Sequence, residues 1–431
     1  MKILLVKPRW FVHGGVYRFL DDVRFTPLHL AILAALSPGH DVTIIDNDWE
    51  EIPFNCEFDL VGVTVTTFTS EKAYEIADKF RHLGVRVVFG GAHASLMPEE
   101  CLLHADSVVV GEAEYVWPQI LKDALSNSLK TKYHNPLPVN MNDVPFPQRG
   151  LCDRDNRIAT VQATRGCTNS CKFCYLPDVP WHEFRKRDID LVYEELKNLK
   201  QKIVFFVDDN MFADQDYVIR LCEKITPLKL IWSIQAPSDI ADNDRLLAAM
   251  ERAGCFHIHI GFQTINPDSL KSADVRQNRI ENYRHVVKKL HEHKIFVVGF
   301  FVFGFDSDDL RVFEATESAI KEMDLDDVCL YILTPYPGTR FHESFRQEGR
   351  LLARDSSNFG WANAVFKPAL MTPEELENGV QLLYERLYPR LIIRTALKMI
   401  SRLPLFLRHP QLFLIVLKAL FRRVNISRRP G

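Results

Sequence analysis

The sequence predicts an α/β protein in which a doubly wound, Rossmann-like domain precedes a partial (β/α)6 barrel and a helical extension. Two observations predict this class. Short apolar runs alternate with segments of helical periodicity over most of the 431 residues, and many of these runs end in glycine or polar side chains. Such alternation is typical of parallel sheets, whose ligands bind at the carboxyl ends of the strands.

The first alternating region covers residues 1–125. Strands are expected at 3–6, 42–45, 60–65, 85–89 and 107–110, with helices at 27–36 and 71–82. The following stretch, 126–150, contains four prolines and little periodicity, so we interpret it as an inter-domain linker.

The second alternating region covers residues 151–345. Six strands are expected, at 158–163, 203–207, 230–234, 257–261, 297–303 and 328–333, with helices such as 191–199 and 244–253 between them. Six units favour a partial barrel over a closed eight-stranded one. Residues 346–431 should be helical. Thr372-Pro373-Glu374-Glu375 is a strong helix start, and two apolar and basic segments follow Pro389, broken near Pro404 and Pro410.

The composition is that of an ordinary globular protein, with 47% hydrophobic and 25% charged residues, which excludes extensive disorder. No apolar stretch reaches the roughly 18 residues of a spanning helix, and the start of the chain lacks a signal-peptide pattern. We therefore expect a cytoplasmic protein. Nine cysteines, an odd number, favour reduced thiols over a disulfide framework.

Three cysteines, Cys167, Cys171 and Cys174, follow the strand expected at 158–163 with the spacing C-x3-C-x2-C. Three thiolates on one loop can hold three irons of a [4Fe–4S] cubane and leave the fourth iron open to a small molecule. A zinc site would need a fourth ligand, for which His182 is the nearest later candidate. Three unrelated core cysteines are the other alternative, but the loop is rich in polar residues and makes a poor core strand.

This loop, with Phe173 just before its last cysteine, resembles that of the radical S-adenosylmethionine enzymes. The resemblance implies that the cysteines ligate a [4Fe–4S] cluster, that S-adenosylmethionine chelates the open iron, and that one electron cleaves it to a 5′-deoxyadenosyl radical. It also implies contacts to S-adenosylmethionine from the cysteine loop and from residues at the ends of the next strands. These are Phe173, Asp208, Asp209, Asn210, Ser233, Gln235 and Gln263. Gln263 departs from the usual Glu of relatives, which puts any role of a carboxylate there in doubt.

The N-terminal region resembles the cobalamin-binding subclass of these enzymes, through stretches such as Thr26-Pro27-Leu28 and Pro98-Glu99-Glu100. No D-x-H-x-x-G loop is present, so the resemblance implies cobalamin bound without histidine coordination. The residues expected at cobalamin are Thr66, Thr67, Phe68, Thr69, Ser70, Gly90, Gly91, His93, Gly111 and Glu112. A scaffold that binds no cobalamin, with His93 as a structural residue, is the alternative.

The C-terminal segment 389–431 contains ten Lys and Arg residues and no Asp or Glu. Basic residues interleaved with apolar ones favour peripheral contact with a membrane surface, and a helical pair packed on the barrel is the alternative. The stretch from Phe366 to Glu375 resembles the extension of cobalamin-type radical enzymes, some of which methylate hopanoids.

The leading hypothesis is a cobalamin-dependent radical enzyme that methylates an unactivated carbon of a hydrophobic small molecule, with an electron donor such as flavodoxin or ferredoxin and no nucleic-acid partner. The alternative is radical cyclisation, rearrangement, oxidation or carbon–carbon coupling without methyl transfer. A non-catalytic iron–sulfur or cobalamin sensor is the third reading. The mass of the product separates the first two, and formation of 5′-deoxyadenosine separates both from the third. The sequence identifies no side chain for proton or hydrogen transfer.

Overall fold

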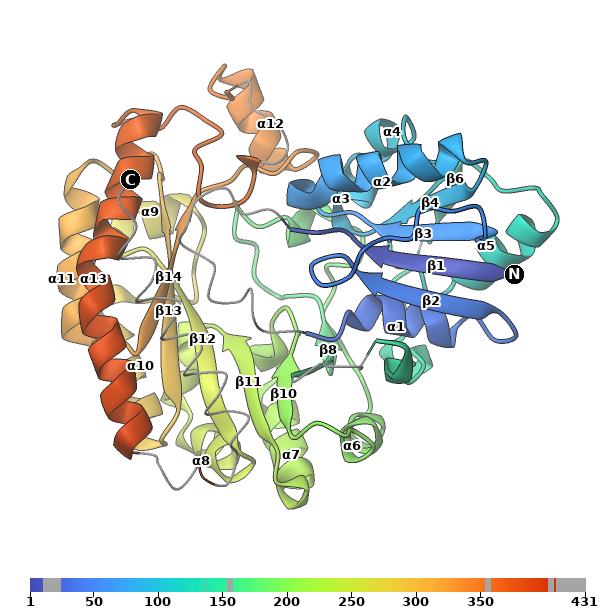
Figure 1. The fold of residues 1–431 in the computed structure, drawn as a ribbon. Coiled ribbons are helices and arrows are strands. Elements are labelled where there is room, and N and C mark those ends of the chain that lie inside the picture. Colours follow the sequence, from blue (N-terminus) through green and yellow to red (C-terminus); the bar gives the residue numbers. More distant parts are fainter. Residues whose placement is uncertain (11–24, 136, 153–157, 353–357, 402–406, 408–431) are drawn as a thin grey trace.

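The computed structural model describes residues 1–10, 25–135, 137–152, 158–352, 358–401 and 407 (Figure 1). Two six-stranded parallel sheets lie side by side, the N-terminal one in blue and the second in green to orange. The last long helix, in red, covers the outside of the second sheet.

The N-terminal sheet has the strand order β2-β1-β3-β4-β5-β6. Its strands are β1 (Lys2–Lys7), β2 (Asp41–Asp46), β3 (Leu60–Thr64), β4 (Arg86–Gly90), β5 (Ser107–Val110) and β6 (Lys132–His134). Residues 3–6 are fully buried because helices cover both faces of the sheet. Those helices are α1 (Leu28–Ala35), α2 (Ser70–His82), α3 (Ala92–Leu96), α4 (Pro98–Cys101) and α5 (Trp117–Leu125).

All five strands and both helices expected in this region are present. The stretch 126–150, interpreted as an inter-domain linker, contains one strand that was not expected, because β6 extends the sheet beside β5. Only Tyr133 of this strand is buried, and Lys132 and His134 on either side of it are exposed. A strand of three residues with one apolar side chain has no detectable alternation in the sequence.

The second sheet has the order β14-β13-β12-β11-β10-β7, and its two free edges leave the barrel open, as predicted. Its strands are β7 (Ala159–Val161), β10 (Ile203–Phe206), β11 (Ile231–Ala236), β12 (Cys255–Gln263), β13 (Phe296–Phe303) and β14 (Asp327–Ile332). The six expected strands are therefore confirmed. The antiparallel pair β8 (Thr164–Arg165) and β9 (Arg185–Lys186) was not expected, since each strand has only two residues.

Helices connect these strands and pack on the outer face of the sheet. They are α6 (Ile189–Lys197), α7 (Gln215–Ile225), α8 (Asp244–Arg252), α9 (Pro267–Ser272), α10 (Tyr283–Glu292) and α11 (Arg311–Met323). A further helix, α12 (Arg340–Gln347), follows β14. The apolar side chains between the helices and the sheet form one continuous core, which holds the strand ends in fixed positions.

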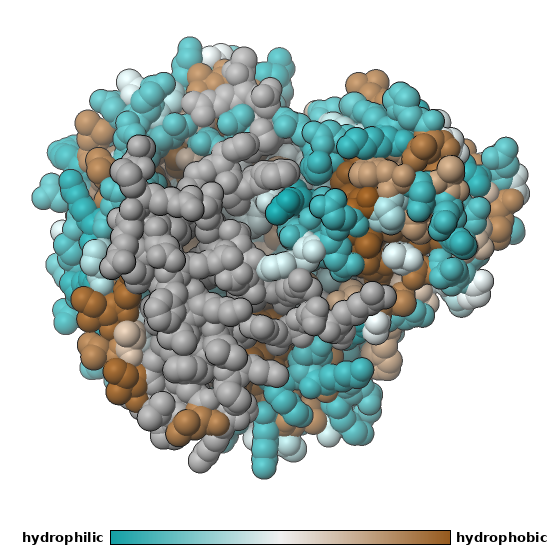
Figure 2. Space-filling view, in the orientation of Figure 1, coloured by the Kyte–Doolittle hydropathy of each residue, from teal (hydrophilic) through white to brown (hydrophobic). Residues whose placement is uncertain are grey.

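The C-terminal helix α13 (Pro373–Ser401) begins as its sequence predicts. The Thr372 hydroxyl accepts from the Glu375 backbone N–H at 3.1 Å, and the Glu375 carboxylate accepts from the Thr372 N–H at 2.8 Å. The helix continues through Pro389. Figure 2 shows hydrophobic surface over its carboxyl-terminal half, at the lower left. Among the described helices none is both long and apolar enough to cross a membrane. The breaks expected at Pro404 and Pro410 lie outside the described residues.

Candidate active site

A cavity of about 1060 Å³ extends from the N-terminal domain through the interior of the barrel. Lys7, Trp10, Thr26 and His29 line it from the N-terminal side, and all six barrel strands contribute residues from the other side. The cavity reaches the carboxyl ends of the barrel strands, where α/β proteins of this kind place their chemistry.

The cysteine loop is shaped by its backbone. Gly166 has φ +82°, and a Cβ there would lie 2.2 Å from the carbonyl oxygen of Glu183, so only glycine fits. The Cys167 N–H donates to the carbonyl of His182 at 3.0 Å, and the Cys174 N–H donates to that of Cys171 at 3.1 Å. All three cysteines of the loop line the cavity.

Amide groups are directed at the sulfur atoms of this loop. The Asn169 N–H lies 3.4 Å from Cys167 Sγ, and the Asn210 side-chain amide lies 3.6 Å from the same atom. The Gln277 amide lies 3.7 Å from Cys171 Sγ. N–H groups directed at thiolates stabilise their charge and tune an iron–sulfur cluster, so this donor set fits a [4Fe–4S] group.

The zinc alternative for the loop is not supported by the arrangement of the side chains. The Nδ1 atom of His182 donates to the carbonyl of Val179 within its own turn, at 3.1 Å, which leaves only Nε2 as a possible ligand atom. In the described part of the chain no three His, Cys, Asp or Glu side chains are close enough to hold one metal ion. A cubane spaces its thiolates further apart, because each binds a different iron. The arrangement therefore suits the cluster better than a single ion.

Asp208 and Asp209 connect the end of β10 to the cysteine loop. The Asp208 carboxylate is buried and accepts from the Ala163 N–H at 3.1 Å, from the Thr164 hydroxyl at 2.7 Å and from the Thr164 N–H. Burial raises the pKa of Asp208 to about 7, although these hydrogen bonds oppose the shift. Asp209 accepts from the Gly166 N–H at 2.9 Å, and burial raises its pKa as well. These contacts position the loop.

The seven residues expected at S-adenosylmethionine all line the same cavity as the three cysteines. Among them Gln263 has the left-handed φ of +66°, which is uncommon outside glycine, and a register shift separates it from Gly261 on β12. Non-glycine residues held in this conformation concentrate at functional sites. The assignment of these residues to S-adenosylmethionine stays a prediction.

The residues expected at cobalamin do not line this cavity. The segment 66–70 begins just after β3, where the Thr66 and Thr69 hydroxyls lie 2.8 Å apart. His93 is buried, with Nδ1 at 3.2 Å from the Thr67 hydroxyl and Nε2 at 3.1 Å from the Tyr74 hydroxyl. Both ring nitrogens are therefore engaged within the domain. Because His93 is engaged in this way and segment 66–70 presents hydroxyl groups, the arrangement fits cobalamin that is bound without histidine coordination.

Glu112, also expected at cobalamin, binds two arginines of the barrel domain. Its carboxylate lies 2.8 Å from Arg165 Nη1 and 2.8 Å from Arg185 Nη1. Arg165 also pairs with Glu114 at 2.5 Å. Of the predicted glycines, Gly111 donates its N–H to the Ser95 hydroxyl at 3.0 Å, Gly90 ends β4, and Gly91 precedes α3. The Glu112 carboxylate thus joins the two domains.

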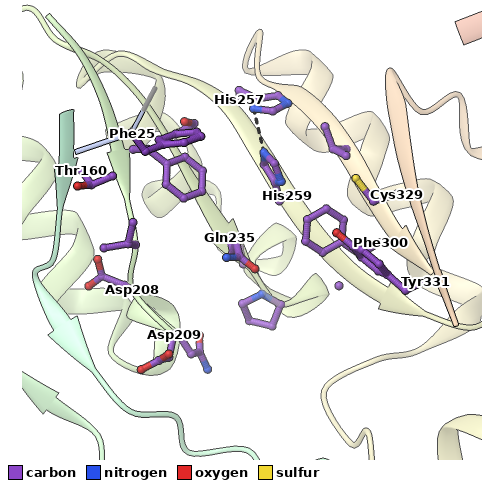
Figure 3. Close-up of a pocket in the computed structure, with 18 of the residues that line it drawn as sticks. Phe25, Thr160, Asp208, Asp209, Gln235, His257, His259, Phe300, Cys329 and Tyr331 are labelled. Carbon is purple, nitrogen blue, oxygen red and sulfur yellow. Dashed lines mark hydrogen bonds between the residues drawn. The ribbon is translucent and has the colours of Figure 1, made fainter. Parts of the chain in front are cut away.

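Two histidines inside the barrel were not among the site residues predicted from the sequence. His257 and His259 point into the cavity from β12, with His259 Nε2 at 3.2 Å from His257 Nδ1 (Figure 3). The pKa of His259 is lowered well below its ordinary value, first by burial and then by electrostatic interaction with the neighbouring His257. The ring centroid of His259 lies 5.8 Å from that of Phe205 and 5.1 Å from that of Phe300. These histidines could have been predicted as cavity residues, because they alternate with an apolar residue within the expected strand 257–261 and so lie on one face of it.

Aromatic rings continue from His259 toward the N-terminal domain. Phe300 contacts Tyr331 at 5.4 Å between centroids, and Tyr331 contacts Trp361 at 5.3 Å. Trp361 contacts Trp10 at 5.3 Å and Phe68 at 5.4 Å. Phe68 belongs to the segment expected at cobalamin, so one aromatic wall connects that segment with the barrel interior. On the other side, Phe25 and Phe205 lie 5.5 Å apart.

Comparison with known families gives two matches. The model of the radical SAM superfamily matches residues 161–318, and that of the B12 binding domain matches residues 23–121. The first match includes the cysteine loop, and the second includes the segments expected at cobalamin.

Individual proteins agree with these matches. The bacteriochlorophyllide d C-12(1)-methyltransferase of Chlorobaculum tepidum is 32% identical over 83% of this chain and 81% of its own length. The bacteriochlorophyllide d C-8(2)-methyltransferase of the same organism is 26% identical over 87% and 89%. The solved cobalamin-dependent S-adenosylmethionine radical enzyme OxsB, with 16% identity and a TM-score of 0.68 over 90% of this chain and 66% of that one, shares the fold.

Proposed function

We propose that this chain, which belongs to the cobalamin-dependent radical S-adenosylmethionine methyltransferase family, methylates an unactivated carbon at the edge of a planar tetrapyrrole. The family's cofactors are a [4Fe–4S] cluster, S-adenosylmethionine and cobalamin. When bound, the cluster with S-adenosylmethionine supplies a 5′-deoxyadenosyl radical, and cobalamin supplies the methyl group.

The aromatic cavity is the observation that carries the substrate class. Its volume of about 1060 Å³ is at the upper end of small-molecule sites, which hold roughly 300–1,000 Å³. Tyr331 and Trp361 on one wall and Phe25 and Phe205 on the other offer faces and edges to a flat conjugated ring. The two bacteriochlorophyllide methyltransferases described above act on bacteriochlorophyllide d, by their names, and this supports a tetrapyrrole.

The residues of this chain have separable roles in that reaction. The three cysteines would hold the cluster, and the amides of Asn210 and Gln277 would donate to their sulfurs. Asp208 and Asp209 hold the loop in place through backbone N–H groups. Ser233 and Gln235 of β11 and Gln263 at the end of β12 line the same cavity, so they can bind the polar groups of S-adenosylmethionine. Phe173 lines it from the cysteine loop. The enclosing aromatic walls exclude water from a reactive radical.

The experiment is anaerobic turnover of the protein reconstituted with iron, sulfide and hydroxocobalamin. The reaction contains a one-electron reductant, methyl-labelled S-adenosylmethionine and a magnesium chlorin. A product heavier by one methylene unit that carries the label supports the proposal. A changed chlorin without the label would favour radical chemistry without methyl transfer and would overturn it. The Cys171→Ala protein is the matched control and should give neither the product nor 5′-deoxyadenosine.

We also propose that a small acidic one-electron carrier of the flavodoxin or ferredoxin type binds at the cysteine loop. Thr168, Ser170 and Lys172 of this loop are exposed, so the loop reaches the surface and offers a positive charge. Lys172→Glu should slow electron transfer from such a carrier several-fold and leave reduction by dithionite unchanged. Equal slowing with both reductants would contradict this site.

Peripheral binding to an anionic membrane is a further part of the proposal. Ile393, Leu397 and Ile400 are 62%, 61% and 70% exposed on one stripe of α13, and more basic residues follow them in the sequence. Vesicles of phosphatidylglycerol should sediment the protein, and vesicles of phosphatidylcholine should not. Leu397→Glu combined with Ile400→Glu should reduce the bound fraction. Unchanged sedimentation of this variant, or none of the wild type, would contradict membrane contact.

A further inference from the structure

Two histidines in the barrel interior have no part in the cofactor binding described above. His257 and His259 lie on β12 with their ring centroids 4.5 Å apart and their planes at 78°. One nitrogen of each ring takes part in the 3.2 Å contact between them (Figure 3). A neutral imidazole that donates through Nε2 has a lone pair on Nδ1. With its Nε2 directed at His257, His259 is therefore equipped to bind a group that accepts electrons.

The surroundings of His259 favour its neutral form. The rings of Phe205 and Phe300 lie against it at 5.8 Å and 5.1 Å, and burial of this kind disfavours an imidazolium. A neutral imidazole has a lone pair that can bind a metal. Two histidines alone are too few for a free metal ion, and among the described residues no group of three or more His, Cys, Asp or Glu side chains that could hold one ion includes them. They suit a metal ion that is already bound by the four nitrogens of a macrocycle and accepts one further ligand.

We propose that His259 is the axial ligand of the magnesium ion at the centre of the tetrapyrrole substrate and that His257 positions it. His259 would donate its Nε2–H to His257 Nδ1 and bind the metal through Nδ1. A metal-ligating histidine usually donates its other N–H in this way, which fixes its tautomer and orientation. This inference rests on the proposed function, because it requires a metallated macrocycle in the cavity.

The position of His259 agrees with reaction at the edge of the ring. It lies four residues before Gln263 on β12, which is roughly 13 Å at about 3.3 Å per residue. A macrocycle centred at His259 would therefore have its periphery, rather than its metal, nearest the S-adenosylmethionine end. A purely hydrocarbon polycycle, such as a hopanoid core, would offer the Nδ1 atom of buried His259 no polar partner, which is costly.

The test is equilibrium binding of zinc protoporphyrin IX and of metal-free protoporphyrin IX to the reconstituted protein, without reductant so that no turnover occurs. Zinc porphyrins take one axial ligand, and its binding shifts their main absorption band to longer wavelength. We expect the zinc form to bind at least ten-fold more tightly and to show this shift. The His259→Phe protein, which keeps an aromatic ring, should bind both forms equally and show no shift.

Two further variants separate ligation from packing. His259→Gly should lose the shift and regain it when free imidazole is added, which a merely structural role would not produce. Phe300→Leu should weaken the binding of both porphyrins by a similar factor and should retain the shift of the absorption band. Equal affinity of the wild type for the two porphyrins would overturn the ligation and leave the proposed function in place. Binding of neither porphyrin would count against the proposed function itself.

Discussion

Arg165 Nη1 lies 2.8 Å from Glu112 Oε1, so the residue two positions before the first cysteine of the loop is bound to the other domain. Arg185 binds the same carboxylate from β9, with its Nη1 2.8 Å from Glu112 Oε2. Strand β8 contains Arg165 and pairs with β9, so both arginines hold the antiparallel pair against the N-terminal domain. The cysteine loop is thereby fixed relative to the segments expected at cobalamin.

Glu112→Gln should destabilise the protein because it leaves two partly buried arginines without their shared charge. The side chains of Arg165 and Arg185 are 12% and 13% exposed. Breaking a buried pair typically costs about 3–5 kcal/mol, so we expect the free energy of unfolding to fall by about 3 kcal/mol in urea titration. The control is Glu99→Gln, since Glu99 is 78% exposed in its pair with Lys132. That variant should lose less than about 1 kcal/mol. Equal losses would show that Glu112 has no special role.

Cys171→Ala should abolish cluster binding. Reconstituted wild-type protein should hold about four irons per chain with visible iron–sulfur absorbance, and the variant should hold little iron and form no 5′-deoxyadenosine. Cys56→Ala is the matched control, because Cys56 is an exposed thiol outside the cavity. Iron and 5′-deoxyadenosine at wild-type levels in Cys171→Ala would remove the cluster from this loop.

Gln263 gives a test of backbone strain at the site. Its φ of +66° costs a side chain with a Cβ roughly 1 kcal/mol and costs glycine nothing. Gln263→Ala and Gln263→Gly both remove the amide, so both should weaken S-adenosylmethionine binding in calorimetry. Of the two, the glycine variant should be the more stable by about 1 kcal/mol. If the alanine variant is as stable as the glycine variant, the left-handed conformation is not held in solution.

Strand positions could be predicted because their physical signal is local. The runs 203–207 and 297–303 are apolar throughout, as strands covered on both faces must be, and the structure places β10 and β13 there. The spacing of the three cysteines was equally local. β6 was missed because a single buried residue, Tyr133, gives no pattern.

Other features depend on tertiary packing and could not be predicted. Pro389 lies inside α13, although proline in a helix interior costs about 3 kcal/mol. Leu387 and Leu391 on either side are buried against the barrel, and this burial offsets the cost. The aromatic wall joins Trp10, Phe68 and Trp361, which are far apart in the chain. Only the approach of the two domains brings these rings together.

Asp326 should make the stability of the protein depend on pH in acid. It directly precedes β14 in the chain. Its carboxylate accepts from His291 Nε2 at 2.9 Å and from the Val297 N–H at 2.8 Å. Arg394 and Lys398 of α13 form ion pairs with the same carboxylate. Burial alone would raise the pKa of Asp326, but these partners outweigh it and lower the pKa to about 2.

The direction of the effect follows from this lowered pKa. Above pH 4 the carboxylate is ionised in both states and its full contribution is present. Between pH 4 and 2 the unfolded chain binds the proton first, so the contribution is lost as the pH falls. Its size is about 2.5 kcal/mol, from nearly two pKa units at 1.36 kcal/mol each.

The free energy of unfolding of Asp326→Asn should therefore be about 2.5 kcal/mol lower than that of the wild type at pH 6, and the difference should vanish near pH 2. Asp324→Asn, with a side chain 54% exposed, is the control and should show a small difference. A difference between Asp326→Asn and wild type that stays constant down to pH 2 would mean that packing, rather than charge, makes Asp326 important for attaching α13.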